Sequence, residues 1–346
     1  MHQARLSSRS SCHRILLGGL LLCATAFPAR AGKYAGEFLE LGVGARGLGM
    51  GQAMTAVTDD AYSFYWNPAG LALVNRRSVS GMAASSFGEL SDPLASTMQV
   101  GFTMPVGLAN LALNYLRFSV TDIPRYPSYP DAAYSFAERR RLIEENGGEP
   151  LGSFEDVEQA LFFSFAKLNE LTLNFGWLYR EIPMRIPVGA NFKVIQNELD
   201  GHKAQGIGAD AGIQVQFSLD DLITLSGLGD LCLAARFENF TNTGLEWDVG
   251  EDAINYNHVY GFAWKRRFEN LGVVLSQDID HRYETVHRTG LELDWKSRVR
   301  VRTGTLGRQD RWTYGAGFMF RDLSVDYAGF DHDLGRVHRL SLVYHL

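Results

Sequence analysis

Residues 203–217 read Lys-Ala-Gln-Gly-Ile-Gly-Ala-Asp-Ala-Gly-Ile-Gln-Val-Gln-Phe, and large or apolar side chains alternate with polar or very small ones. The odd positions from Ile207 to Phe217 are all apolar, whereas the even positions from Gly206 to Gln216 carry only Gly, Asp or Gln. A period of two residues is typical of a β-strand whose two faces meet different surroundings. The stretch therefore predicts a strand with one apolar face and one polar face.

The same alternation recurs from about residue 77 to the carboxyl terminus, in segments of roughly ten residues with turn-forming residues between them. The chain also ends on such a segment, in which Leu340, Leu342, Tyr344 and Leu346 alternate with mostly polar side chains. We count about fifteen segments, although a single-chain bacterial barrel has an even number of strands. At least one assignment is therefore wrong, and the weakest are 171–180 and 323–330. Further segments lie at 161–166, 186–194, 256–264, 271–275, 291–295 and 312–320.

Alternation of this kind is found in two classes of protein. A soluble β-sandwich alternates because one face packs on its core and the other meets water. A membrane barrel alternates because its strands of about ten residues face lipid outside and a polar lumen inside. The number of long strands, the aromatic residues near strand ends and the lack of a helical pattern that could cover a sheet favour the barrel. We predict an all-β protein, a transmembrane β-barrel of the bacterial outer membrane.

The first residues have the layout of a secretory signal peptide. A basic stretch with Arg5, Arg9 and Arg14 precedes an apolar run at 15–27, and small residues follow up to Ala31. The apolar run is too short for a membrane-spanning helix, which needs about 20 residues. We predict export, with residues 1–31 removed as a signal peptide.

The charge and cysteine content of the mature chain exclude several functions. Cleavage would remove four of the 33 basic residues and no acidic one, so that 29 basic residues face 39 acidic ones and the net charge is −10. This balance argues against nucleic acid as a partner. Only Cys232 would remain, which excludes an intramolecular disulfide and a multi-cysteine metal site. We predict no metal and no other cofactor.

Residues 36–71 do not alternate, and their motifs carry a family resemblance. A glycine-rich stretch at 42–51 leads to Asp-Asp-Ala at 59–61 and to Tyr-Trp-Asn-Pro-Ala-Gly-Leu at 65–71. This order of motifs resembles the amino-terminal segment of the PorV/PorQ family of outer-membrane proteins, which are related to the FadL-type barrels. Later matches at 120–124 and 333–342 extend the resemblance from about residue 35 to the end of the chain.

The resemblance implies a barrel of about 14 antiparallel strands with an amino-terminal plug, or hatch, inside it. It divides the mature chain into a plug segment at 32–76 and a barrel at 77–346. On local grounds the Asn-Pro step indicates only a turn. The resemblance makes it part of a plug motif that shapes a ligand path, whose residues are Gly44, Gly47, Gly49, Trp66, Asn67, Pro68, Ala69 and Gly70.

Glycines on the predicted lumen face fit such a plug. Without a side chain they would let the plug backbone approach the wall closely. We expect this of Gly176, Gly208, Gly212, Gly272 and Gly315.

Two catalytic interpretations are weaker than their structural alternatives. The glycine spacing at 42–47 matches a dinucleotide-binding pattern, but that pattern is meaningful only between a strand and a helix of a βαβ unit, and no such helix follows. Ser276, Asp278, Asp280, His281 and His287 include the side chains of a hydrolytic triad, yet nothing in their spacing orients a base against a nucleophile. Polar residues near a barrel rim explain them equally well. We therefore predict that the protein is not an enzyme.

Charged side chains on two adjacent strands predict a salt ladder in the lumen. Charge on the lipid face of a barrel costs about 2–4 kcal/mol near the midplane, which places these residues inside. With a three-residue turn at 295–297, Asp294 would lie opposite Arg298, and Glu292 opposite Arg300. The ladder consists of Glu292, Asp294, Arg298, Arg300 and Arg302. The alternative is a selectivity site for a charged solute.

A long connection at about 121–157 is predicted to be an extracellular loop. It contains Tyr126, Tyr129 and Tyr134, and the stretch at 131–146 could form a short helix. The loop fits a surface that faces a protein partner, and it fits a solvated lid without a partner equally well.

Two functions agree with these features. The first is a channel-type protein that binds or passes hydrophobic small molecules, as FadL-type barrels do along an internal plug path. The second is an outer-membrane partner of a protein secretion system, a type IX-like role that resembles the cargo handling of PorV. A purely structural barrel is a third, weaker alternative. An apolar pocket near the plug would favour transport, and an aromatic loop in contact with another protein would favour secretion.

Overall fold

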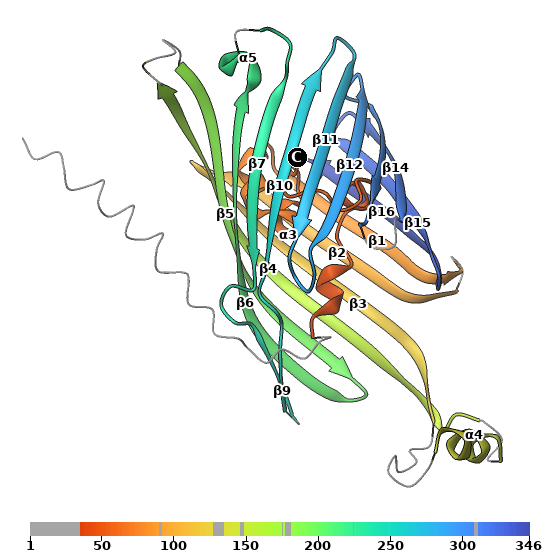
Figure 1. The fold of residues 1–346 in the computed structure, drawn as a ribbon. Coiled ribbons are helices and arrows are strands. Elements are labelled where there is room, and N and C mark those ends of the chain that lie inside the picture. The colour runs from red at the N-terminus through yellow and green to blue at the C-terminus, as the bar shows by residue number, and fades with distance from the viewer. Residues whose placement is uncertain are drawn as a thin grey trace, which may run out of the picture.

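The computed structural model describes residues 35–89, 92–126, 135–145, 149–174, 176, 181–223, 225–248, 250–307 and 311–346. Sixteen strands form one antiparallel sheet, and 14 of them close into a barrel (Figure 1). The barrel strands are β1 (Ser78–Glu89), β2 (Asp92–Val106), β3 (Ala109–Arg125), β4 (Gly152–Asn174), β5 (Glu181–Leu199), β6 (His202–Ser218), β7 (Asp230–Glu238), β10 (Asn257–Arg267), β11 (Leu271–Asp280), β12 (Val286–Trp295), β13 (Val299–Thr305), β14 (Trp312–Phe320), β15 (Leu323–His332) and β16 (Gly335–His345). The other two, β8 (Gly244–Trp247) and β9 (Gly250–Ala253), form a hairpin that pairs with β6 only. The predicted barrel is confirmed.

The two faces of the wall differ as the alternation predicted. In β10, Val259 and Ala263 point inward and are fully buried, whereas Tyr260 and Phe262 point outward and are 48% and 44% exposed. Outward-pointing apolar side chains recur on the other strands, including Phe163, Phe165, Phe192, Ile207, Leu233, Leu293, Val301, Phe318 and Leu340. Every wall strand hydrogen-bonds to a neighbour on each side, so the wall has no open edge, which is the condition for a sheet to lie in hydrocarbon.

The barrel has two different rims. The near rim is the end where β1 begins at Ser78 and β16 ends at His345, two residues that pair with each other. It also carries the tight turn at 296–298. The far rim is the opposite end, and it carries the β8–β9 hairpin and the connection between β3 and β4 (Figure 1).

The connection between β3 and β4 is shorter than predicted. The two strands remain paired out to Arg125 and Gly152, with a bulge between Val120 and Ile123, so the connection spans 126–151. The predicted limits of 121 and 157 are wrong because the ladder resumes beyond the bulge. Within the connection, α4 (Phe136–Glu145) lies inside the stretch predicted to be helical.

Two doubtful strand assignments have different outcomes. Segment 323–330 belongs to β15, so the doubt about it was wrong. Segment 171–180 contains the end of β4 at Asn174, while residues 175 and 177–180 lie outside the described residues.

Residues 35–77 contain no strand and lie inside the barrel, and we call them the inner segment (Figure 1, red to orange). The segment includes four short helices, namely η1 (Glu37–Glu40), α2 (Ala45–Gly49), α3 (Ser63–Trp66) and η2 (Pro68–Leu73). It starts at the far rim, where Tyr283 donates a hydrogen bond to Glu37, and it ends at the near rim, where Arg76 pairs with Asp322 at 2.8 Å. The chain thus traverses the lumen before it enters the wall.

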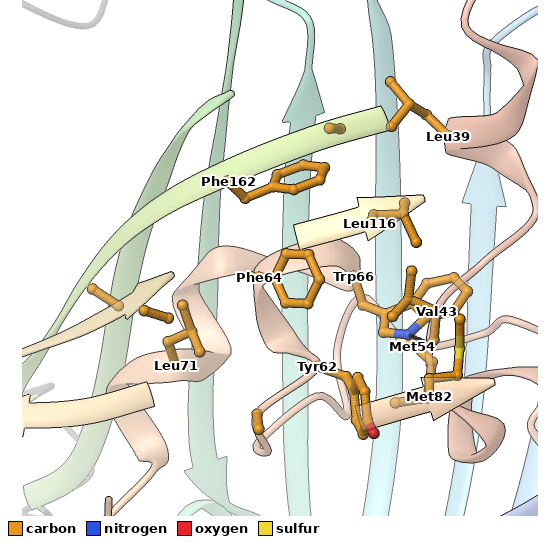
Figure 2. Packing of buried hydrophobic residues seen from close by; sticks show 14 of the residues in the cluster. Leu39, Val43, Met54, Tyr62, Phe64, Trp66, Leu71, Met82, Leu116 and Phe162 are labelled. Atoms are coloured by element: carbon orange, nitrogen blue, oxygen red, sulfur yellow. Dashed lines mark hydrogen bonds between the residues drawn. The ribbon is translucent and has the colours of Figure 1, made fainter. Parts of the chain in front are cut away.

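The hydrophobic core of the protein is the contact between the inner segment and the wall (Figure 2). Phe64, Trp66 and Leu71 of the inner segment are fully or almost fully buried, and the Phe64 ring packs edge-on against Phe162 of β4 with centroids 5.1 Å apart. Full burial of such a side chain stabilises a fold by about 1.5–3 kcal/mol. The described residues include no helix with the length and apolarity needed to cross a membrane.

Candidate functional site: the filled lumen

The glycine-rich stretch of the inner segment encloses Trp66. The indole Nε1 donates a hydrogen bond to the Val43 carbonyl at 2.8 Å. A Cβ on Gly47 would overlap the Trp66 ring, and one on Gly42 would lie 3.1 Å from it. These glycines therefore make room for an indole inside the barrel, and the dinucleotide pattern has a structural explanation.

The two other predicted glycines place the segment against its surroundings. Gly44 has a φ of 78°, a left-handed conformation that favours glycine, and it precedes the single turn of α2. A Cβ on Gly44 would lie 3.0 Å from the Tyr62 ring, and one on Gly49 would lie 3.1 Å from the Cα of Gly315 in β14. At Gly49 the backbone of the segment and the backbone of the wall thus lie in contact.

The Asn-Pro-Ala-Gly motif forms a turn that binds the wall. Asn67 is extended with a φ of −166°, as expected before proline, and Pro68 begins η2. The Asn67 Oδ1 accepts a hydrogen bond from the Ala69 N–H at 3.1 Å, and Nδ2 donates to the Thr55 carbonyl at 2.9 Å and to the Ile213 carbonyl of β6 at 3.3 Å. One side chain therefore caps the turn, holds the segment together and ties it to β6.

The wall is open to backbone contact at this motif. A Cβ on Gly212 would overlap the Asn67 side chain, and one on Gly189 of β5 would overlap the Pro68 carbonyl group. The pairing of β5 with β6 skips Pro187, which has no backbone N–H, and resumes at Val188. The motif therefore lies against two wall positions without a side chain, Gly189 and Gly212, and beside a break in the hydrogen-bond ladder between β5 and β6.

Six wall glycines have this relation to the inner segment, since a Cβ on each would press on a segment atom: Gly189, Gly212, Gly261, Gly290, Gly304 and Gly315. Of the five glycines named from the sequence, Gly212 and Gly315 are among them. The other three face elsewhere: Gly208 faces Thr243 and Lys193, Gly272 faces Arg267 and Asp294, and Gly176 has no atom within 4 Å of an added Cβ. The four glycines that were not predicted, Gly189, Gly261, Gly290 and Gly304, occupy inward positions of their strands. The alternation of the sequence could have identified them.

A buried ionic network joins the inner segment to three wall strands. Arg46 contacts Asp59 at 2.6 Å and Asp60 at 3.1 Å on its own segment, and it pairs with Glu292 of β12. Glu292 in turn pairs with Arg302 of β13 at 2.6 Å, and Arg302 pairs with Asp326 of β15 at 2.5 Å. Burial raises the pKa of Asp60, whereas at Asp59 the cations Arg46 and Lys265 outweigh burial and lower the pKa.

The predicted salt ladder has a different register. Glu292 lies opposite Arg302 and Asp294 lies opposite Arg300, because Trp295 still pairs with Val299 and the turn occupies 296–298. The predicted pairs, Asp294 with Arg298 and Glu292 with Arg300, are therefore wrong by two residues along β13. Arg298 lies in the turn and is exposed.

The side chains named for a hydrolytic triad have other partners. The Asp278 Oδ2 accepts hydrogen bonds from the Met54 and Thr55 N–H groups at 3.0 and 2.9 Å, and from the Thr55 hydroxyl at 2.7 Å. Ser276 faces the lumen and contacts the Gly290 carbonyl at 3.5 Å, while the His281 ring stacks on His258 at the far rim. His287 is exposed. Asp278 is thus an anchor of the inner segment, a role that its sequence context did not reveal.

Of the three tyrosines assigned to the long loop, only Tyr126 is among the described residues, and it is 48% exposed. Tyr129 and Tyr134 lie outside the described residues. The nearby Phe136 at the start of α4 is 76% exposed.

The inner segment leaves cavities at both rims. At the near rim, an open cavity of about 620 Å³ is lined mainly by charged residues, among them Arg46, Asp60, Lys265, Glu292 and Arg300. At the far rim, a cavity of about 570 Å³ has an apolar wall that includes Phe38, Leu41, Phe118, Leu245 and Trp247. The far rim also holds a smaller cavity of about 330 Å³ lined by charged residues such as Arg282 and Arg311, so apolar surface beside the inner segment is offered by one of the two far-rim cavities.

Comparison with known proteins identifies the fold. No protein-family model matches the chain, and no curated protein matches it. The toluene transporter TodX of Pseudomonas putida matches with a TM-score of 0.51 at 10% identity, over 88% of this chain and 99% of that one. The Ralstonia pickettii toluene transporter TbuX matches with a TM-score of 0.46 at 10% identity, over 87% and 97% of the two chains. The KdgM porin matches with a TM-score of 0.33 at 6% identity, over 78% and 99%. The match to TodX shows that the chain has the fold of an outer-membrane β-barrel of 14 antiparallel strands.

Proposed function

We propose that this protein passes hydrophobic small molecules across the outer membrane, with the inner segment as a displaceable plug. The observation that carries the proposal is the apolar cavity at the far rim, because it lies directly against the start of the inner segment at Phe38 and Leu41. Hydrophobic ligands favour concave apolar sites with a few polar groups. The PorV/PorQ and FadL-type resemblance of the sequence and the transporter fold support the same function. The near rim, where the chain enters and leaves the wall, would face the periplasm.

The contacts of the inner segment define what a displaceable plug has to release. Polar contacts tie it to the wall along its whole length, among them Asp278 on Met54 and Thr55, Arg46 on Glu292, and Arg236 on the Trp66 carbonyl. Wall glycines meet its backbone directly, whereas Phe64 packs on the wall side chain of Phe162. A ligand that enters at the far rim meets the first residues of the segment, so its binding can favour a shifted position of the segment.

A reversible lock tests this proposal. The Ala45 N–H donates to the Ser341 hydroxyl of β16 at 3.0 Å, so a disulfide between Ala45→Cys and Ser341→Cys in a Cys232→Ser background would fasten the segment to the wall. We expect uptake of the uncharged dye N-phenylnaphthylamine into proteoliposomes to stop on oxidation and to return on reduction. Each single cysteine variant serves as a control. Undiminished uptake by the oxidised pair would contradict a displaceable plug.

A role as an outer-membrane partner of a secretion system is the second candidate. Phe136 of α4 and Tyr126 are exposed on the connection between β3 and β4, which is the kind of apolar surface that protein partners cover. This role predicts that Phe136→Ser abolishes co-purification of a defined protein and leaves dye uptake unchanged. Dye uptake that falls in parallel would argue against a separate partner surface.

A further inference from the structure

The cavity at the far rim has an unusual set of charges, and we call it the acidic far-rim cavity. Besides its apolar wall, it is lined by the carboxylates Glu37, Asp156, Glu158 and Asp252. Its lining includes no Lys, Arg or His. Among the described residues, no basic side chain forms an ion pair with any of the four.

The acidic character of this cavity contrasts with the rest of the lumen. Several other carboxylates inside the barrel are paired with buried cations, as Glu292 is with Arg302 and as Asp210 is with Lys193 at 2.7 Å. Within the cavity the carboxylates have only neutral partners: Glu37 accepts from Tyr283, Asp252 from Trp247, and Glu158 from Asn197. Among the described residues, these carboxylates therefore have no cation beside them, which is the condition under which a ligand cation is favoured.

A buried acceptor on the same wall gives an independent indication of a ligand. Asn197 is 5% exposed and lines the cavity. Its Nδ2 donates to Glu158 at 2.8 Å, but its Oδ1 is buried without a hydrogen-bond partner. A buried acceptor of this kind costs free energy unless a donor reaches it. A ligand that carries a hydrogen-bond donor would supply what this side chain lacks.

Resting on the function proposed above, we propose that the acidic far-rim cavity selects hydrophobic molecules that carry an amine or another cationic donor over those that carry a carboxylate. The apolar part of the ligand would pack against Phe118, Leu245 and Trp247. Its ammonium group would lie beside Asp156 and Glu158, and a turn of the Asn197 side chain would bring its Oδ1 within reach as an acceptor. A carboxylate in the same place would face like charges and a carbonyl acceptor, and both are repulsive.

Three ligands of matched shape test the proposal. The full mature chain in a nonionic detergent is dialysed to equilibrium against 4-phenylbutylamine, 4-phenylbutanol or 4-phenylbutyrate. We expect the amine to bind at least about tenfold more tightly than the carboxylate, with the alcohol between them. The double variant Asp156→Asn, Glu158→Gln should reduce this ratio to about twofold or less. Glu246→Gln, which is exposed on β8 and outside the cavity, serves as the matched control and should leave the ratio unchanged.

The outcomes separate this inference from the proposed function. Equal binding of the three ligands, or tighter binding of the carboxylate, overturns the charge selection and leaves hydrophobic transport standing. Binding of none of them overturns both. Lys33 lies outside the described residues, and amine binding that appears only in a Lys33→Gln variant would show that the protein supplies its own cation, which also overturns the inference. If the double variant does not fold, the ratio measured for the unmodified chain decides.

Discussion

Arg46 of the inner segment and Glu292 of the wall form a bidentate ion pair, with Nε to Oε2 at 3.0 Å and Nη2 to Oε1 at 3.1 Å. Both oxygens of a wall carboxylate are thereby directed at one guanidinium of the segment. Because Glu292 also accepts from Arg302, one carboxylate is shared by two buried cations, and Asp59, Asp60 and Asp326 complete the network. The pair is a point at which a change in the wall acts directly on the inner segment.

Removing this carboxylate should loosen the inner segment. Glu292→Gln leaves Arg46 and Arg302 without their shared partner, and breaking a buried pair from one side costs about 3–5 kcal/mol. We expect a lower midpoint of thermal unfolding and faster maleimide labelling of Cys232, which is 2% exposed. Glu269→Gln, in the exposed turn between β10 and β11, is the matched control. An unchanged labelling rate in Glu292→Gln would show that the pair does not hold the segment.

The loss of stability caused by a Gly→Ala substitution in the wall should depend on whether that glycine touches the inner segment. Gly212→Ala places a methyl group on the Asn67 side chain, whereas at Gly81 the nearest atom to an added Cβ is 3.9 Å away. Overpacking of this kind costs about 1–3 kcal/mol. We expect Gly212→Ala to lower the urea midpoint of the folded barrel and Gly81→Ala to leave it near that of the unmodified chain. Equal urea midpoints for the two variants would mean that the inner segment moves away from Gly212 without a cost in stability.

The Asn67 side chain should control how often the segment leaves the wall. Asn67→Ala removes the donor to the Thr55 and Ile213 carbonyls, and an unsatisfied buried acceptor costs about 1–3 kcal/mol. Labelling of Cys232 should therefore accelerate, since Cys232 lines a near-rim cavity together with Leu73 of the segment. Arg77→Ala, on the same segment but exposed and outside that cavity, should label at the rate of the unmodified chain. Faster labelling in both variants would point to general destabilisation.

The charge of the Asp278 carboxylate should contribute more to holding the inner segment than the position of its acceptor oxygens does. Asp278→Asn keeps one acceptor oxygen but loses the charge that receives two backbone N–H groups and one hydroxyl. Hydrogen bonds to an ionised acceptor are about twice as strong as neutral ones. We expect increased proteolysis near Met54 in the folded barrel, compared with Ser276→Ala as a control from the same strand. Protection equal to that of the control would assign Asp278 a passive role.

The alternation of the sequence predicted the strands and the direction of their side chains, and the number of strands with the aromatic residues near their ends favoured a barrel over a sandwich. In 203–217 every odd position from Ile207 faces outward and every even position from Gly206 faces inward, because a strand in a closed wall can satisfy the pattern only in this way. The position of residues 36–71 inside the barrel was expected from motif resemblance, since local patterns there indicate only turns.

Register and contacts could not be predicted in the same way. The turn after β12 places Lys296 and Ser297 at φ values of 53° and 55°, yet neither residue is one of the usual signals for a left-handed turn. The wall glycines and the acidic far-rim cavity are formed by residues far apart in the chain, such as Phe38, Glu158 and Leu245. Such groupings depend on the closure of the barrel.

Single-channel recording in planar bilayers tests the central claim most directly, namely that the inner segment closes the barrel. We predict that the unmodified protein shows almost no steady conductance, whereas a variant lacking residues 36–73 that still assembles as a heat-modifiable barrel conducts steadily. Glu292→Gln should show brief openings between these two extremes. A steady conductance of the unmodified protein equal to that of the deletion variant would contradict the account.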